Sequence, residues 1–311
     1  MADADILPLH VNRRGPGADL RWLVGIDGGG TTTRLRLCSV KGELLSEATA
    51  GPSALGQGIH QAWEQVDLAF ARAAERAGLE GLSWRQCAIG FGVSGANVRD
   101  LAEQLIEAAP DCALLAVDTD SFAAVLGAHG GGPGAVLIGG TGSVCEVLRS
   151  HGTRASVGGW GWVVGDEGSG AWLGKQGVRQ VQHALDGRGS SGPMTRALLE
   201  SIGGGTETFK QWCAAARQTE FAALAPVLFD CEAEDPVARG ILDAAARALE
   251  ALADAADPSG QLPLCLSGSV ALQLAPRMRA HLLARRVLPR ADATWGAVEL
   301  ARRAANLPIF E

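Results

Sequence analysis

Two glycine-rich turns, each lying between an apolar strand and a second strand, constrain the fold of this chain most strongly. They occupy residues 25–34 (GIDGGGTTTR) and 137–143 (LIGGTGS). Glycine lets backbone amides approach phosphate oxygens closely and tolerates positive φ, and hydroxyl side chains add hydrogen-bond donors. One such turn alone is typical of an ordinary β-hairpin. Two at equivalent places in the chain predict a pair of loops that hold one polyphosphate from both sides.

The elements around these turns repeat in order. The first series comprises strands at 22–26, 35–40 and 43–48, a helix at 57–78, a strand at 87–93, a helix at 97–109, a strand at 113–117 and a helix from Asp120. The second comprises strands at 135–138, 144–148 and 155–157, a helix at 169–185, two or three helices within 194–256, a strand at 262–266, a helix from 270, a short strand near 286–288 and a closing helix from 293. This duplication predicts an α/β fold of two related lobes with a ligand-binding cleft between them.

The repeat also predicts the domain boundaries. We expect a flexible tail over residues 1–20, an N-terminal lobe over 21–128, and a C-terminal lobe over 129–291 that carries a helical insertion. The C-terminal helix, within 292–311, is expected to pack back on the N-terminal lobe.

Charge and composition exclude several classes of protein. The net charge is −7 and basic residues do not cluster, so nucleic acid is not an expected partner. No long uncharged apolar stretch predicts a membrane span, and the N-terminus lacks the pattern of a signal peptide. The seven cysteines form no CxxC pair, which favours reduced core thiols over zinc or iron–sulfur ligands. We therefore expect a cytoplasmic protein.

Three other glycine motifs fail on context. A dinucleotide-binding loop opens a helix, whereas residues 33–40 alternate like a strand. Residues 170–176 (GAWLGKQ) are too short for a P-loop and have Gln176 where a hydroxyl is required. Residues 91–96 (FGVSGA) resemble a nucleophile elbow, but no later histidine lies in a distinctive setting. A ligand-facing turn at Ser94 fits better than a serine hydrolase.

Three aspartates lie where strands end. Asp27 follows the first strand, beside the glycines, where a carboxylate can hold Mg²⁺ through water; the alternative is an Asx-type turn cap. Asp118 and Asp120 follow the strand at 113–117, and either is also typical of a helix N-cap. A carboxylate there can accept the proton of an attacking hydroxyl in phosphoryl transfer. Their positions alone do not choose between the two.

A loop rich in glycine and tryptophan lies at residues 158–170 (GGWGWVVGDEGSG). Aromatic rings beside carboxylates suit a sugar, which presents an apolar face and many hydroxyls. The alternative is a capping loop with Trp160 and Trp162 in the core.

The motifs DGGGTTTR, TDSFAAVLGAH, LIGGTGS, GGWGWVVGDEGSG and LSGS, in this order, resemble the BadF/BadG/BcrA/BcrD-type ATPase family, and within it the bacterial glucosamine and N-acetylglucosamine kinases. The resemblance covers residues 22 to about 304. It implies the actin/sugar-kinase/Hsp70 fold with two ribonuclease-H-like lobes. It also implies an ATP-dependent kinase that uses Mg²⁺ and phosphorylates an amino sugar, at the 6-hydroxyl, and it leaves open whether the protein forms a homodimer.

The resemblance also implies the roles of individual residues. ATP-binding positions are Gly28, Gly29, Gly30, Thr31 and Thr32 in the first loop, Gly140, Thr141, Gly142 and Ser143 in the second, and Gly268 and Ser269 along the adenosine. Asp120, which directly precedes SFAA, matches the catalytic base and contacts the sugar. The other substrate-binding positions are Ser94, Gly95, Gly159, Trp160, Gly161 and Asp166.

Two departures bear on the substrate. Family N-acetylglucosamine kinases carry an asparagine shortly after the third strand, where this chain reads GPSAL at 51–55, and another where it has Val144. Their absence leaves unacetylated glucosamine as an equal candidate. The rival activity is a nucleotide-driven switch that activates a protein partner, because the same fold serves such roles; the paired cysteines of the dehydratase activators are missing here.

Overall fold

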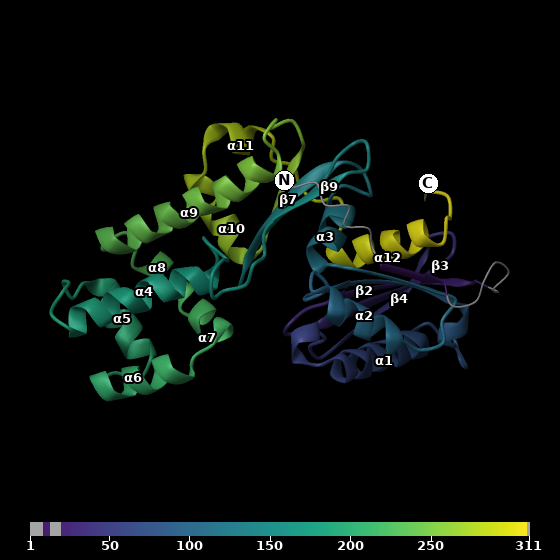
Figure 1. Cartoon of the computed structure of the whole chain (residues 1–311), viewed down its shortest axis with the longest axis horizontal. Coiled ribbons are helices and arrows are strands. Elements are labelled where there is room, and N and C mark those ends of the chain that lie inside the picture. The colour runs from purple at the N-terminus through teal and green to yellow at the C-terminus, as the bar shows by residue number, and fades with distance from the viewer. Residues whose placement is uncertain (1–8, 13–19, 310–311) are drawn as a thin grey trace.

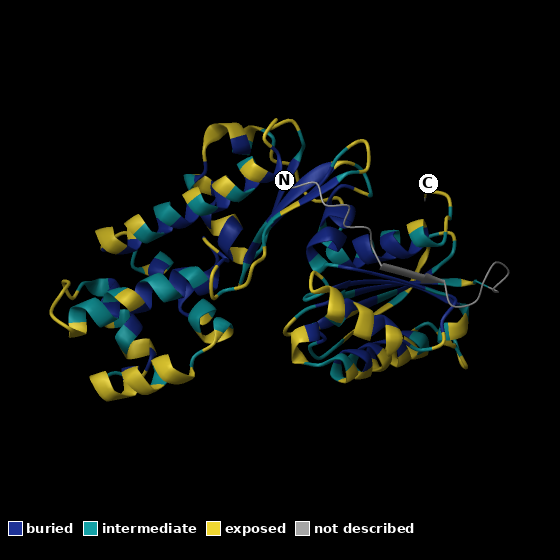
Figure 2. Ribbon diagram, in the orientation of Figure 1, coloured by how far each residue is buried: buried dark blue, intermediate teal, exposed yellow. Residues whose placement is uncertain are grey.

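The computed structural model describes residues 9–12 and 20–309. The chain forms two lobes, each built on one sheet with helices packed against it (Figure 1). The central strands of both sheets are buried, whereas the outer faces of the helices Ile59–Arg76 (α1) and Thr206–Ala215 (α6) are exposed (Figure 2). This confirms the predicted α/β class and the two lobes.

The N-terminal sheet has six strands in the order β1-β6-β5-β2-β3-β4. Their bounds are Leu9–Asn12 (β1), Trp22–Gly28 (β2), Thr33–Ser39 (β3), Leu44–Ala50 (β4), Cys87–Val93 (β5) and Leu114–Asp118 (β6). Strands β2, β5 and β6 run parallel, and β3 and β4 extend the sheet as antiparallel hairpins. Parallel neighbours bring the carboxyl ends of β2, β5 and β6 to one edge of the sheet, where ligands of α/β proteins bind.

Helices cover both faces of this sheet. Helices α1 (Ile59–Arg76) and α2 (Arg99–Glu107) pack on one face, and α3 (Asp120–Ala128) and α12 (Ala293–Ala304) lie side by side on the other (Figure 1). The C-terminal helix α12 therefore returns to the N-terminal sheet. Glycine permits this close approach: a Cβ at Gly296 would lie 1.7 Å from Ala123 O, and one at Gly90 would lie 1.9 Å from Ala297 O.

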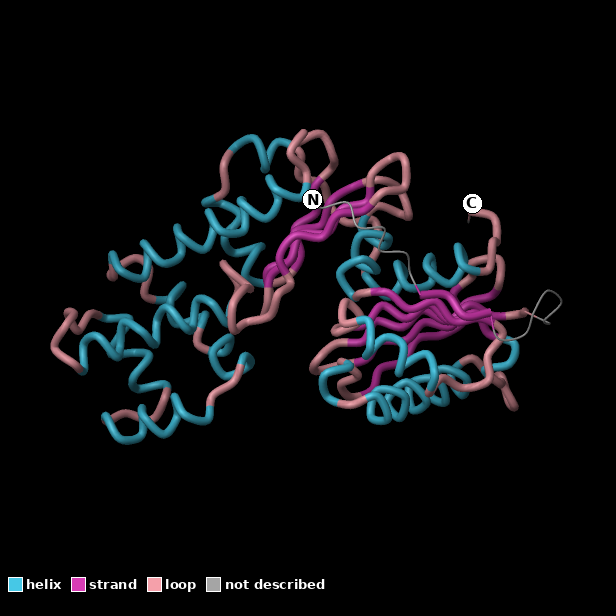
Figure 3. Tube along the Cα trace, viewed as in Figure 1, coloured by secondary structure: helices cyan, strands magenta, loops and turns pink. Residues whose placement is uncertain are grey.

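The C-terminal sheet has four strands in the order β10-β7-β8-β9. Its strands form a group apart from those of the N-terminal sheet (Figure 3, magenta). Their bounds are Gly134–Gly139 (β7), Ser143–Leu148 (β8), Arg154–Gly158 (β9) and Leu264–Ser267 (β10). The β7-β8-β9 hairpins repeat β2-β3-β4, and β10 runs parallel to β7 as β5 runs parallel to β2. The predicted duplication is thus present in the strand order.

The remaining helices all belong to the C-terminal lobe. They are α4 (Gly170–Leu185), α5 (Pro193–Ser201), α6 (Thr206–Ala215), α7 (Gln218–Ala223), α8 (Ala225–Asp230), α9 (Pro236–Ala256), α10 (Ser269–Leu274) and α11 (Ala280–Ala284); short 3₁₀ turns lie at Leu55–Gln57, Trp84–Gln86 and Ala275–Arg277. No helix in the described ranges is both long enough and apolar enough to cross a bilayer.

Three sequence predictions differ from the structure. Residues 194–256 hold five helices rather than two or three, because three glycines at positive φ (203–205) and prolines at helix starts divide the segment. The expected strand at 286–288 is only an isolated bridge between Leu264 and Arg286. Within the predicted tail, Leu9–Asn12 pairs with β6 and covers what would otherwise be a sheet edge; residues 1–8 and 13–19 lie outside the described residues.

Candidate active site

Three strand ends and one helix start form the centre of the site. In the register of the N-terminal sheet, Asp27 on β2 stands opposite Gly92 on β5, and Gly92 stands opposite Asp118 on β6. Helix α3 begins directly after β6, with Thr119 as its N-cap: the threonine hydroxyl accepts a hydrogen bond from the backbone N–H of Phe122. Asp120 is the first residue of this helix.

Gly92 allows the start of α3 to lie over the sheet. A Cβ at this position would lie 2.5 Å from the Cβ of Ala123 and 3.7 Å from the Cα of Asp120. A larger residue would push the helix away from β5. The glycine therefore brings Asp120 to the same edge of the sheet as Asp27, as the sequence predicted for strand-end acids.

The two neighbouring acids at the strand ends are in different states. Both oxygens of Asp118 are bound by Arg154, with Nη1–Oδ2 and Nη2–Oδ1 distances of 2.7 and 2.9 Å. Asp120 forms no ion pair in the described part of the chain, and its Oδ1 accepts the backbone N–H of Ser121 at 2.9 Å. A general base needs an available carboxylate. Strand position alone left both acids open, and the resemblance selected Asp120. The carboxylate of Asp118 is engaged by Arg154, and the role of Asp120 as the base stays a prediction.

Burial alters the acidity of the site. It raises the pKa of Asp120, and it raises the pKa of Asp27 to about 6, with the charge of Asp120 as the next cause. The charges of Arg34 and Arg36 act in the opposite direction on Asp27, and that of Asp292 adds to the rise. Two carboxylates near one another oppose each other's ionisation unless a cation joins them.

These features fit a magnesium ion at Asp27. Mg²⁺ in phosphoryl-transfer sites takes one or two carboxylates together with water and phosphate oxygens rather than a cage of protein ligands. The described residues contain no cluster of three or more His, Cys, Asp or Glu side chains suited to a metal. Asp27 supplies one carboxylate at the strand end. Burial first, and the charge of Asp120 second, raise its pKa, and a bound cation would oppose both effects.

Replacing Asp27 by asparagine should stabilise the ligand-free protein at alkaline pH. Because the folded-state pKa of about 6 lies above the ordinary value of 3.8, ionising Asp27 costs stability as the pH rises between these values, and the cost is complete above them. Asp27→Asn removes that cost, which is at most about 3 kcal/mol.

Thermal melts of both proteins at pH 4 and pH 8 would measure this effect. We expect a higher Tm for Asp27→Asn at pH 8 and little difference at pH 4, together with weaker binding of Mg–ATP. A variant that melts below the unchanged protein at pH 8 would contradict the assignment.

Several backbone N–H groups of the first glycine loop donate no hydrogen bond within the described protein. Gly29 N–H closes the turn on Thr32 O, and the carbonyls of Gly28, Gly29 and Gly30 accept hydrogen bonds from residues 53–57 and Ser94. Within the described residues, the backbone N–H groups of Gly30, Thr31 and Thr32 donate to no protein acceptor. All three residues are exposed. Exposed backbone amides without a protein acceptor are able to bind an anion.

The first residues of α4 form hydrogen bonds with the backbone of the second glycine loop. The N–H groups of Gly170 and Ala171 donate to Gly140 O and Thr141 O at 2.8 and 3.2 Å. The hydroxyl of Ser143 already donates a hydrogen bond to Glu167 O within the protein. The N–H groups of Thr141 and Gly142 have no acceptor among the described residues. The donors that this loop offers to a phosphate are therefore those of its tip.

The predicted adenosine positions lie beside the second loop. Gly268 has φ of +86°, and a Cβ there would lie 2.4 Å from Gly139 O and 2.9 Å from Gly140 N. Ser269 begins α10. The sequence reasoning placed these residues on the same nucleotide as Gly140, and the structure brings the two segments into contact.

The predicted substrate turn Ser94-Gly95 adjoins the first loop. Ser94 N–H donates to Gly28 O at 2.9 Å, and Ser94 O accepts from Leu55 N–H at 3.0 Å. Gly95 has φ of +97°, with Leu55 Cβ 3.2 Å from the position its own Cβ would take. The turn thus links the first glycine loop to the segment that follows β4.

The tryptophan loop presents one ring and packs the other. Trp160 is 81% exposed, so the alternative of a core residue is excluded for it. Trp162 is half-buried between Phe221 and Lys175, whose Nζ donates to Trp162 O at 2.7 Å. Gly159 and Gly161 have positive φ and shape the turn on either side of Trp160.

Asp166 lies against the second glycine loop. Its Oδ1 accepts the N–H of Ser143 at 3.2 Å and its Oδ2 accepts Gln218 Nε2 at 2.9 Å, and only 4% of the residue is exposed. A Cβ at Gly142 would meet its carboxylate at 2.9 Å. The structure therefore gives Asp166 a role in shaping this loop, and its contact with a sugar stays a prediction.

Sequence reasoning missed two basic residues of the site. Arg34 stands opposite Asp27 in the β2–β3 register and is exposed; strand alternation past the glycine turn could have indicated it. Arg154 binds Asp118 from the other lobe, and no local signal in the sequence points to that contact.

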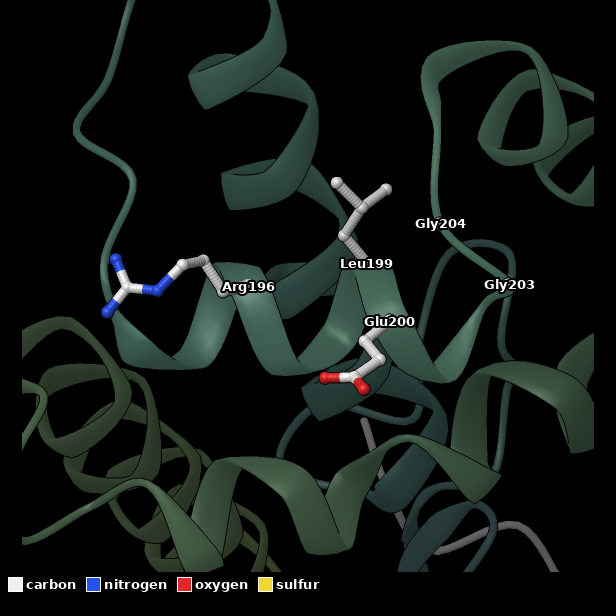
Figure 4. A pocket seen from close by; sticks show the side chains of 5 residues that line it. All are labelled: Arg196, Leu199, Glu200, Gly203 and Gly204. Carbon is white, nitrogen blue, oxygen red and sulfur yellow. The ribbon is translucent and has the colours of Figure 1, made fainter.

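Two surface cavities lie away from this site. One of about 360 Å³ is lined by residues of α5 and the turn after it (Figure 4): Arg196, Leu199, Glu200, Gly203 and Gly204. The other, of about 290 Å³, lies where the chain passes between the lobes, beside His129 and Arg290. Neither is lined by a predicted site residue.

Comparison with known proteins agrees with this geometry. Over 283 residues the chain is 30% identical to a glucosamine kinase of Vibrio cholerae, an alignment that covers 91% of this chain and 96% of the relative. A crystal structure from Chromobacterium violaceum, assigned as an N-acetylglucosamine kinase, is 40% identical with a TM-score of 0.87 and covers 91% and 99% of the two chains.

A ROK-family glucokinase of Streptomyces griseus, 18% identical with a TM-score of 0.52 over 92% of this chain and 99% of that one, shares the fold alone. The fold is thus the actin/hexokinase-like one expected. The sequence model of a single family matches residues 24–301, nearly the whole described chain. This protein belongs to the BadF/BadG/BcrA/BcrD ATPase family.

Proposed function

We propose that the protein transfers the γ-phosphoryl group of ATP to the 6-hydroxyl of an amino sugar, glucosamine or N-acetylglucosamine. The observation that carries this proposal is the pairing of exposed loop amides with an available carboxylate at Asp120. The relatives named as glucosamine and N-acetylglucosamine kinases support the same activity.

The residues divide the work of phosphoryl transfer. The oxygen of the sugar hydroxyl attacks the γ-phosphorus, and ADP leaves. Asp120 accepts the proton that this hydroxyl loses. The N–H groups at the tips of the two loops stabilise negative charge on the phosphoryl oxygens. Magnesium, held through Asp27, would offset part of the charge of the triphosphate. Trp160 offers an exposed ring to the apolar face of the sugar.

Two positions favour the free amine over the acetamide. Val144 is apolar, and its Cγ2 lies 3.4 Å from where a Cβ of Gly159 would stand. The Ser53 hydroxyl is buried and lies 2.7 Å from Thr33 Oγ1, so it is already hydrogen-bonded. An acetamide that enters an apolar site leaves its own polar groups unpaired.

A panel of sugars with ATP and Mg²⁺, assayed by ADP release and by mass of the sugar product, tests the function. We expect kcat/KM for glucosamine to exceed that for N-acetylglucosamine about tenfold, in line with the cost of an unpaired polar group. The opposite order would overturn the preference but not the kinase activity. The rival switch activity would appear as hydrolysis stimulated by a protein and by no sugar.

We place the protein in the cytoplasm, which supplies ATP. The seven cysteines, five of them buried and none in a disulfide, support this location because thiols persist in a reducing compartment.

A further inference from the structure

A buried ionic cluster joins the two lobes. The guanidinium of Arg154, at the start of β9, binds both oxygens of Asp118 at the end of β6, and its Nη2 also lies 3.2 Å from Glu146 Oε1 on β8. The three side chains are 8%, 2% and 2% exposed. One acid belongs to the N-terminal sheet, whereas the arginine and the other acid belong to the C-terminal sheet.

The same cluster contacts residues that precede and follow Asp120 in the chain. Arg154 binds Asp118, two residues before it, and packs over the ring of Phe122, two residues after it, at 3.2 Å from the centroid. Ser121 Oγ donates to Glu146 Oε2 at 3.3 Å. Asp120 itself is left out of these bonds. Its backbone is therefore held by side chains of the other lobe while its carboxylate stays available.

A cluster of this kind is a weak source of stability. Burying charges costs about as much as their attraction returns, so a well-packed apolar group would serve as well. The paired, planar geometry of an arginine–carboxylate contact instead fixes orientation. In this structure the orientation it fixes is that of the turn from β6 into α3.

We propose that Arg154 is a positioning residue that aligns Asp120 for proton transfer and makes this alignment depend on where the C-terminal sheet lies. The proposal rests on the proposed function, in which Asp120 is the base. A shift of β9 relative to β6 would move Asp118 and Phe122 together, and Asp120 lies between them.

Arg154→Lys tests this role, because lysine keeps the positive charge but cannot form the paired hydrogen bonds from Nη1 and Nη2 to Asp118. Arg285→Lys is the matched control, because Arg285 also forms a buried arginine–aspartate pair, with Asp257, and the two side chains are 9% and 4% exposed. Neither residue is near Asp120 in the chain or among its contacts. We expect kcat to fall about 10- to 100-fold in Arg154→Lys, with KM for ATP and sugar within threefold of normal. Arg285→Lys should lose similar thermal stability and keep its kcat within twofold.

An equal loss of kcat in the two variants, or a normal kcat in Arg154→Lys, would overturn the proposal. If Arg154→Lys does not fold, Asp118→Asn is judged by the same criteria. It keeps the shape of the side chain but disrupts the same paired contact with Arg154.

The tests of function and of positioning are separable. An unchanged protein that phosphorylates no sugar ends the proposed function and this role with it, whereas loss of transfer in Asp120→Asn with normal kcat in Arg154→Lys ends only the positioning role.

Discussion

Asp120→Asn protein should bind ATP normally and transfer its γ-phosphoryl group about 10²- to 10⁴-fold more slowly, the usual contribution of a general base. Asparagine keeps the size of the side chain and its contact with Ser121 N–H but cannot accept a proton. ATP affinity should persist because the loop amides do not involve this residue. Single-turnover transfer to glucosamine, with ATP binding measured by calorimetry, would separate the two effects.

Asp100→Asn is the control for this experiment. Asp100 is likewise an aspartate in the first turn of a helix, α2, but it is exposed and lies outside the site. It should leave transfer within twofold of normal. Retention of more than a tenth of the turnover in Asp120→Asn would remove Asp120 from the role of base.

The pH dependence of the unchanged enzyme provides a second measurement. Burial raises the pKa of Asp120 above its ordinary value of 3.8, and the base acts only when ionised. As the pH falls through the raised pKa, kcat should fall, so the acidic limb lies at higher pH than for an exposed aspartate. That limb should disappear from the residual activity of Asp120→Asn.

Local patterns were enough to predict most of the fold. Strand alternation and the glycine turns predicted the β2-β3 and β7-β8 hairpins, because side-chain period and turn geometry depend on neighbours in sequence. Helix division within 194–256 was wrong, since a short helix depends on its packing as much as on its residues. The β1 pairing with β6 likewise joins segments far apart in the chain.

The candidate site was predicted less completely, for a similar reason. Asp27 and the loop glycines follow from motif and strand position. Strand position left Asp118 and Asp120 as alternatives, and the family resemblance selected Asp120. The ion pair that occupies Asp118 could not be predicted, because Arg154 reaches it from the other lobe. The role of Asp166 behind Gly142 likewise appears only once the 158–170 loop has folded back on β8. Contacts between distant segments leave no periodic signal in either segment.

Gly268→Ala should weaken ATP binding by about 10²-fold or more. The new methyl group would stand 2.4 Å from Gly139 O and 2.9 Å from Gly140 N, and both are backbone atoms that cannot move without moving the loop. The displaced amides of Thr141 and Gly142 would then lose hydrogen bonds to charged phosphate oxygens. Each such bond contributes about 1.5–3 kcal/mol, so losing one or two accounts for the expected change.

Gly152→Ala is a closely matched control for Gly268→Ala. Both glycines have φ of +86°, so an alanine at either position pays a similar backbone strain of about 1–3 kcal/mol. A Cβ at Gly152 meets no atom within 4 Å, because this residue lies in the turn between β8 and β9. We expect both variants to lose thermal stability and only Gly268→Ala to lose ATP affinity, measured by calorimetry. Of the two new methyl groups, only that at residue 268 would contact the second loop. Equal ATP affinity in the two variants would therefore mean that this loop does not bind the nucleotide.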